Sequence, residues 1–142
     1  MPSTTPVTRG ATFVGIALTV AIVDLALTTA YIHLSLGGPL FTLNAAGYAA
    51  LAAAYAVCLV PHRVVQRFGW LPRLGLAGYA ATTIVAYLVM GPYFSLGWVA
   101  KAIEVALIAL VVGDLVRVYG SPARVAQAAR DTLRGARPAS PA

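Results

Sequence analysis

Charged residues are scarce in this sequence of 142 residues. Asp, Glu, Lys and Arg together make up 10% of it, whereas about a quarter of the residues in a typical soluble domain are charged. Hydrophobic residues make up 60%, and the mean hydropathy is +0.83. This composition excludes an ordinary water-soluble protein. A chain of this length forms at most one domain, and apolar runs of about 20 residues in it are expected to cross a bilayer.

Cysteine is nearly absent, because Cys58 is the single one. An intramolecular disulfide and a cysteine-rich zinc or iron–sulfur site are therefore excluded. The two histidines, His33 and His62, are expected near opposite membrane faces, too far apart to hold one haem within a subunit. We predict no cofactor and no metal site. Since no nucleophile–base pair or catalytic motif is visible, we also do not expect an enzyme.

Acidic residues are few as well, which leaves a net charge of +6 and a pI near 10. A nucleic-acid-binding protein would gather its basic residues in a patch on a folded soluble surface. Here the basic residues lie between and after the apolar runs, so no nucleic-acid partner is expected. The predicted partner is the lipid bilayer, with anionic lipid at the arginine-rich tail.

Apolar residues fall into four segments, each long enough for a membrane-spanning helix. We therefore predict an all-α fold, an integral membrane four-helix bundle with four transmembrane helices. Residues 1–10 are predicted to be a disordered cytoplasmic tail, 11–119 the transmembrane domain and 120–142 a basic cytoplasmic tail. In that tail, Ser121 and Pro122 favour the start of a short helix on the membrane surface. The predicted spans are residues 11–36, 40–60, 74–94 and 96–116.

Arginine positions predict the orientation. If the spans alternate in direction, all nine arginines lie on one side of the membrane, and the two tight turns on the other side carry none. By the positive-inside rule both termini are cytoplasmic. We therefore expect a multi-pass protein of the bacterial inner membrane.

Three ionisable residues fall inside the predicted spans. Asp24 is expected close to the middle of the membrane, and Lys101 and Glu104 lie three residues apart on the fourth span. A charged side chain at the centre of a bilayer costs about 2.5–3.5 kcal/mol, so such residues are candidates for a functional site. A structural ion pair that fixes helix packing is the alternative interpretation.

Helical spacing extends this candidate site. Thr28 and Tyr31 share a face with Asp24 and form a polar stripe, whereas His33 points to the opposite side of that helix. Because polar stripes avoid lipid, we predict that they line an outward-opening pocket that excludes His33. The predicted lining residues are Asp24, Thr28, Tyr31, Asn44, Tyr48, Tyr87, Lys101 and Glu104.

Two functions remain open from the sequence. The pocket would bind or pass a small polar ligand, an ion or a proton. Alternatively, the protein is a non-catalytic accessory or scaffold subunit of a larger membrane assembly, and the same residues only stabilise the bundle. Alanines at four-residue spacing in the first two spans allow helices to approach closely. They fit packing within one chain, a homo-oligomer or contact with another membrane protein equally well.

Overall fold

A computed structural model describes residues 13–135. The described part is all-α as predicted, with 87% of it helical, six helices and no strand. The predicted N-terminal tail, residues 11 and 12 of the first predicted span and residues 136–142 lie outside the described residues.

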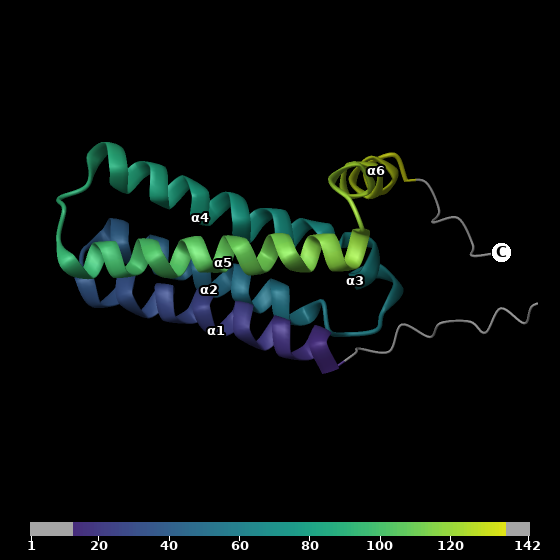
Figure 1. Ribbon diagram of the computed structural model, residues 1–142, viewed down its shortest axis with the longest axis horizontal. Helices are drawn as coiled ribbons and strands as arrows, with labels where there is room; N and C mark the ends of the chain where they lie inside the picture. The colour runs from purple at the N-terminus through teal and green to yellow at the C-terminus, as the bar shows by residue number, and fades with distance from the viewer. Residues whose placement is uncertain (1–12, 136–142) are drawn as a thin grey trace, which may run out of the picture.

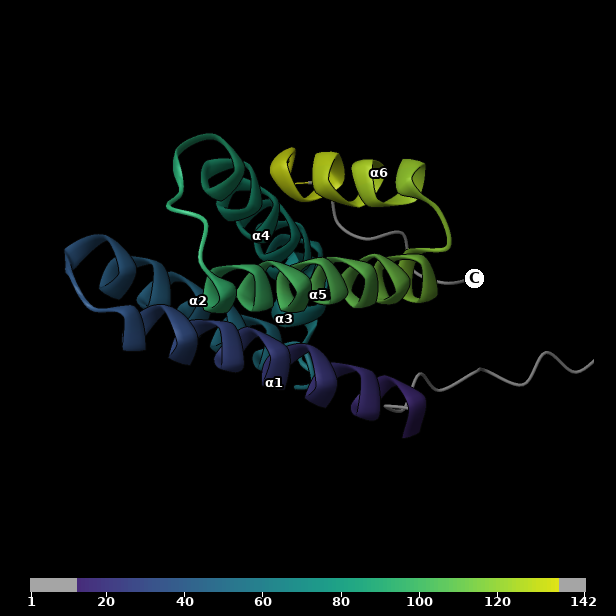
Figure 2. The ribbon, with the colours of Figure 1, turned by 60° about the vertical axis from the view of Figure 1, so that its left-hand side comes forward.

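Four long helices pack lengthwise against one another (Figure 1). Helix α1 contacts α2 and α5, and α4 contacts α2 and α5, so the four form one bundle. The short helix α3 lies between α2 and α4, and α6 crosses one end of the bundle, where it is seen end-on in Figure 1 and lengthwise in Figure 2. The helices are α1 (Phe13–Leu36), α2 (Pro39–Val57), α3 (Arg63–Phe68), α4 (Trp70–Met90), α5 (Ser95–Tyr119) and α6 (Pro122–Leu133).

Three of these helices, α1, α2 and α4, are long and apolar enough to cross a membrane. Helix α5 has 25 residues and differs from them in carrying two acidic and two basic side chains. The three apolar helices indicate a membrane protein.

Glycine and proline determine where the helices end. Gly37 and Gly38 adopt positive φ angles of 71° and 84° and connect α1 to α2 in a tight turn, a conformation that glycine adopts without steric cost. Gly91 is extended, with φ −75° and ψ 144°, because the following Pro92 disfavours a helical conformation at the residue before it. Helix α4 therefore ends at Met90, before the predicted end at residue 94.

The start of α4 also differs from the prediction. Pro72 had set the expected start at Leu74, but the helix begins at Trp70 and holds Pro72 in its first turn. Proline is tolerated there because its missing N–H would have no partner within the helix. The predicted loop between the second and third spans is accordingly shorter and contains the helix α3, where the N–H of Val64 donates to the His62 ring.

The C-terminal tail forms the predicted helix. Ser121 caps α6 by accepting a hydrogen bond from the N–H of Arg124, and Pro122 occupies the first helical position. Val125 and Thr132 are buried against the bundle. Arg67 of α3 donates to the backbone oxygen of Thr132 (3.2 Å), which fixes α6 across this end.

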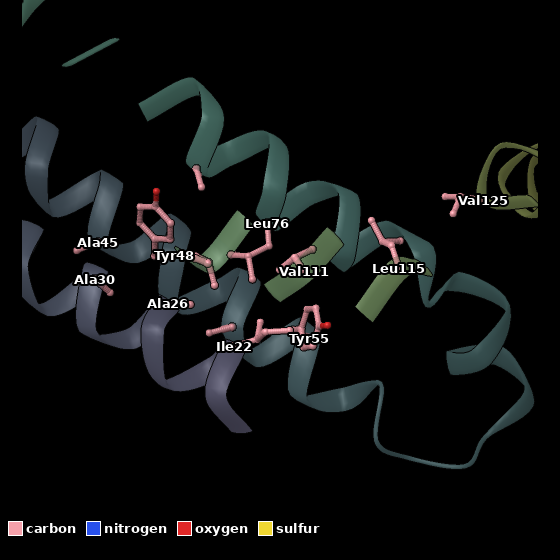
Figure 3. Packing of buried hydrophobic residues seen from close by; sticks show 13 residues of the cluster. Ile22, Ala26, Ala30, Ala45, Tyr48, Tyr55, Leu76, Val111, Leu115 and Val125 are labelled. Atoms are coloured by element: carbon pink, nitrogen blue, oxygen red, sulfur yellow. The ribbon is translucent and has the colours of Figure 1, made fainter. Parts of the chain in front are cut away.

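Small side chains allow α1 and α2 to pack closely. Ala26 and Ala30 of α1, and Ala45 and Ala52 of α2, are buried in one core cluster. The middle of the bundle is apolar: Figure 3 shows Ile22 and Leu76 between the two buried tyrosines of α2, Tyr48 and Tyr55. This apolar layer separates two groups of polar side chains.

Candidate functional site

A cluster of polar side chains from all four long helices lies in the half of the bundle nearest the two turns. We call it the turn-end cluster. Its central residue is Glu104 of α5, whose side chain is completely buried. The other members are His33 of α1, Tyr48 of α2, Thr83 of α4 and Lys101 of α5, which contact Glu104 directly or through one another.

The two carboxylate oxygens of Glu104 have different surroundings. Oε2 lies 2.6 Å from Nζ of Lys101 and accepts a hydrogen bond from the Thr83 hydroxyl at 2.9 Å. The Thr83 hydroxyl has one proton, for Glu104 Oε2 or for the backbone oxygen of Ala80, which is also 2.9 Å away. In both cases the Tyr48 hydroxyl donates to Thr83 Oγ1 at 2.8 Å. Oε1, in contrast, is buried and has no hydrogen-bond partner in the described residues. A buried carboxylate oxygen without a partner is costly, so this atom marks a place where something can bind.

His33 faces this unpartnered oxygen. Its Nε2 atom lies 3.8 Å from Glu104 Oε1, and the His33 side chain is 5% exposed. Its Nδ1 atom lies 2.8 Å from the backbone oxygen of Thr29. Because a carbonyl oxygen only accepts, Nδ1 carries a proton, and a neutral His33 ring therefore turns an unprotonated Nε2 toward Glu104. A carboxylate oxygen and an imidazole nitrogen then face each other with no proton between them.

Lys101 is held between Glu104 and an aromatic ring. Its Nζ atom lies 5.6 Å from the centre of the Tyr87 ring, within the range of a cation–π interaction. The Tyr87 hydroxyl in turn accepts from the N–H of Phe94 and approaches its backbone oxygen, which fixes the α4–α5 turn. Lys101 is 7% exposed, so its charge is almost entirely enclosed.

Four of the eight predicted site residues therefore come together. Lys101, Glu104 and Tyr48 belong to the turn-end cluster, and Tyr87 contacts Lys101 through its ring. Asn44 is half-buried nearby. Its backbone oxygen accepts a hydrogen bond from the Tyr79 hydroxyl at 3.3 Å.

The other three predicted residues lie elsewhere. Asp24, Thr28 and Tyr31 are exposed on the outer side of α1, so the expectation that they line the same pocket is wrong. The expectation that His33 stays outside the site is also wrong. His33 lies on the opposite face of α1, and this face packs into the bundle. That inner face carries Ala26 and Ala30, and small residues favour close helix packing. Periodicity related the two faces correctly, but it did not tell which one packs inward.

A second polar group, the arginine-end cluster, surrounds Asp114 near the other end of α5. Its carboxylate accepts from Tyr55 at 2.6 Å, from Nε of Arg73 at 2.8 Å and from Arg117 at 2.6 Å and 3.0 Å. The predicted pair of Asp114 and Arg117 is present, but Arg73, expected in a loop, lies buried in the first turn of α4. With both oxygens of Asp114 bound, this cluster is a structural link between α2, α4 and α5.

The turn-end cluster is enclosed rather than open. Glu104 is 0%, His33 4% and Lys101 7% exposed. A concave surface of about 470 Å³ lies on α4 instead, and it is lined by Ala81, Thr82, Val85, Ala86, Val89 and Met90. No group of three or more His, Cys, Asp or Glu side chains within residues 13–135 is placed to hold a metal ion. Comparison of the chain with models of known protein families, with curated proteins and with solved structures gives no match.

Proposed function

We propose that the chain is a four-span protein of the bacterial inner membrane, with both termini in the cytoplasm, and that it binds a proton between His33 and Glu104. The four-span placement is supported by α5, which at 1.5 Å per residue is about 37 Å long and so exceeds the roughly 30 Å of hydrocarbon. Its charged side chains Lys101, Glu104 and Asp114 are buried in the bundle and paired there. In membrane-spanning helices, ionisable side chains face the interior of the bundle and pair with one another.

The orientation is supported by the distribution of arginine. Every arginine in the described residues belongs to α3, α6, the residue after α6, the first turn of α4 or the last turn of α5, all at one end. The turns at 37–38 and 91–94 carry none. An excess of arginine marks the cytoplasmic side. With this end inside, α6 lies along the inner surface, where its arginines meet anionic lipid.

The proton-binding proposal depends on one observation: buried Glu104 Oε1 has no partner and faces His33 Nε2 at 3.8 Å. A proton placed on Nε2 turns two facing acceptors into a donor and an acceptor, and a small side-chain movement closes the gap to a hydrogen bond. The ionisable groups around this pair are Tyr48 from α2, Tyr79 and Tyr87 from α4 and Lys101 from α5. Since Lys101 and Glu104 compensate each other, the added proton is the only net charge.

Enclosure favours a proton over a larger ligand. A polar molecule or a hydrated ion would need the bundle to open, because the cluster residues are buried. A proton needs only a hydrogen-bonded route. Conduction across the whole membrane is not supported, because Glu104 and Asp114 are ten residues apart, about 15 Å along α5, and the core between them is apolar. We therefore propose reversible proton binding from the outer side.

The proposal is tested by nitrogen NMR of protein labelled with ¹⁵N-histidine and reconstituted in liposomes. The chain has two histidines, so His62→Gln leaves His33 as the only labelled ring. As the pH is lowered, His33 Nε2 is expected to gain a proton while Nδ1 keeps its own. In Glu104→Gln, Nε2 should stay unprotonated at the same pH, because the side-chain NH2 of glutamine is able to donate a hydrogen bond to the unprotonated nitrogen.

Glu104→Gln keeps the size of the side chain. In protein that retains His62, the His62 signal serves as the control, because it should be the same with and without Glu104→Gln. A His33 ring that never gains the second proton would contradict the proposal. So would one that gains it equally well in Glu104→Gln. Release of the protein from membranes by alkaline carbonate would instead contradict the membrane placement.

The second candidate is an accessory or scaffold subunit of a membrane assembly, in which both polar clusters only stabilise the bundle. The exposed polar stripe of Asp24, Thr28 and Tyr31 favours this alternative, because it calls for a partner within the membrane. Native mass spectrometry of gently extracted protein distinguishes the two. A stoichiometric second protein would support the accessory role, and repeated recovery of the chain without one would contradict it.

A further inference from the structure

The outer face of α1 carries a regular pattern that the bundle does not use. Alternating steps of three and four residues along the helix give the a and d positions of a coiled coil. Starting from Phe13, these steps reach seven residues, and all seven are exposed in the structure. We call them the α1 seam: Phe13, Ala17, Val20, Asp24, Leu27, Tyr31 and Leu34.

Asp24 is the one charged residue of the α1 seam, and it lies near the middle of the helix. Twelve residues separate it from Leu36 at the end of α1, which corresponds to about 18 Å. Within residues 13–135 its carboxylate has neither a hydrogen-bond nor an ion-pair partner. Against lipid at this depth a charged Asp costs about 2.5–3.5 kcal/mol. The outer face of α1 is therefore expected to be covered by protein rather than by lipid.

We propose that a second copy of this chain covers the α1 seam, with the two α1 helices parallel. A two-fold axis along the membrane normal places every residue at the same depth as its counterpart. Asp24 then meets Asp24 of the partner copy, and two carboxyl groups that hold a proton between them hydrogen-bond directly. Neighbouring apolar residues of the seam pack around this pair. This inference rests on the membrane placement proposed above.

One feature favours a second copy over another protein. A single polar residue at an a position among apolar ones is a known way to fix the register of identical parallel helices, because it satisfies itself only when aligned. Within the dimer, Asp24 is left to pair with Asp24, since Lys101 is buried in its own ion pair with Glu104 and the arginines of the described residues lie at one end of the bundle, away from the middle of α1. The α1 seam of one copy is therefore complementary to the α1 seam of a second copy.

Disulfide crosslinking in native membranes tests the proposal. The chain has one cysteine, so Cys58→Ser provides a cysteine-free background for Leu27→Cys in the seam. Val105→Cys is the matched control, because it is also exposed (57% against 47% for Leu27) and lies on α5. Counted from the turn end of each helix, both positions lie at a depth of about 14–15 Å. Oxidation should yield a covalent dimer with Leu27→Cys and little or none with Val105→Cys.

Asp24 is then varied in the Leu27→Cys protein. Asp24→Leu is apolar and suits lipid, so the chain should insert and fold, but crosslinking should fall several-fold. Asp24→Asn pairs with itself and should retain it. Equal crosslinking at both cysteine positions, crosslinking unaffected by Asp24→Leu, or a stoichiometric second protein on the seam would each overturn the proposal. Carbonate release of the uncrosslinked protein would instead count against the membrane placement.

Discussion

At the scale of single residues, the two buried carboxylates of α5 differ in how many of their oxygens have a hydrogen-bond partner. Asp114 is bound on both oxygens by a tyrosine and two arginines. Glu104 is bound on one oxygen and leaves the other facing His33. A fully bound buried carboxylate stabilises a fold, whereas a half-bound one is able to respond to a change in its surroundings. This contrast is why we place function at Glu104 and structure at Asp114.

The role of Asp114 gives a prediction about stability. Asp114→Asn keeps the shape of the side chain but removes the charge that compensates the buried Arg73. Breaking a buried ion pair from one side costs about 3–5 kcal/mol, so the free energy of unfolding should fall by roughly this amount. Reversible unfolding in mixed micelles measures it.

Asp131→Asn is the control for that experiment, because Asp131 is exposed on α6 and forms no ion pair in the described residues. It should change the free energy of unfolding by less than about 0.5 kcal/mol. Equal effects of the two substitutions would show that Asp114 does not link the helices as described.

Sequence reasoning found the residue types of the candidate site better than their positions. Lys101 and Glu104 were identified because charged residues are rare in apolar segments. His33 lies outside the predicted site because the prediction groups side chains by their angle from Asp24 and assumes that the polar face of α1 packs inward. The alanines at 26 and 30 carried the missing signal, since small residues mark a packing face. Arg73 was missed because Pro72 was read as preceding the helix rather than as part of its first turn.

At the scale of helices, the contact between α4 and α5 depends on glycine near the turn. A Cβ atom at Gly97 would lie 2.5–2.8 Å from the hydroxyl and ring of Tyr87, closer than atoms pack. Tyr87 is also held by Phe94, so it cannot move freely. Gly97→Ala should therefore lower the free energy of unfolding by about 1–3 kcal/mol, the usual effect of overpacking, and thermal unfolding in detergent measures it.

Helix α5 itself supplies the matched control. Gly113 has no atom within 4 Å of the position that a Cβ would occupy. Alanine is the better helix former, so Gly113→Ala should leave stability unchanged or raise it by up to about 1 kcal/mol. If Gly97→Ala were equally harmless, the close packing of Tyr87 against α5 would not hold.

At the scale of the whole molecule, the uneven distribution of charge is the basis of the proposed placement in the membrane. The end with α3 and α6 carries the arginines, whereas the two turns at the other end carry no charge. Helix α6 is seen end-on in Figure 1, where the long helices lie lengthwise, so it crosses the arginine end at a steep angle to them. In the proposed four-span placement, with α1, α2, α4 and α5 in the hydrocarbon, a helix in this position lies in the plane of the membrane surface, where its arginines reach lipid headgroups.

This arrangement predicts on which side each end reacts with a membrane-impermeant thiol reagent. In the Cys58→Ser background, Pro92→Cys places a thiol in the α4–α5 turn, and Leu133→Cys places one at the exposed end of α6. Pro92→Cys should be labelled after the outer membrane is opened, and Leu133→Cys only after the inner membrane is permeabilised. Only α5 and α6 lie between the two positions in the chain, so the result also tests whether α5 crosses the membrane. Labelling of both from the same side would mean that it does not.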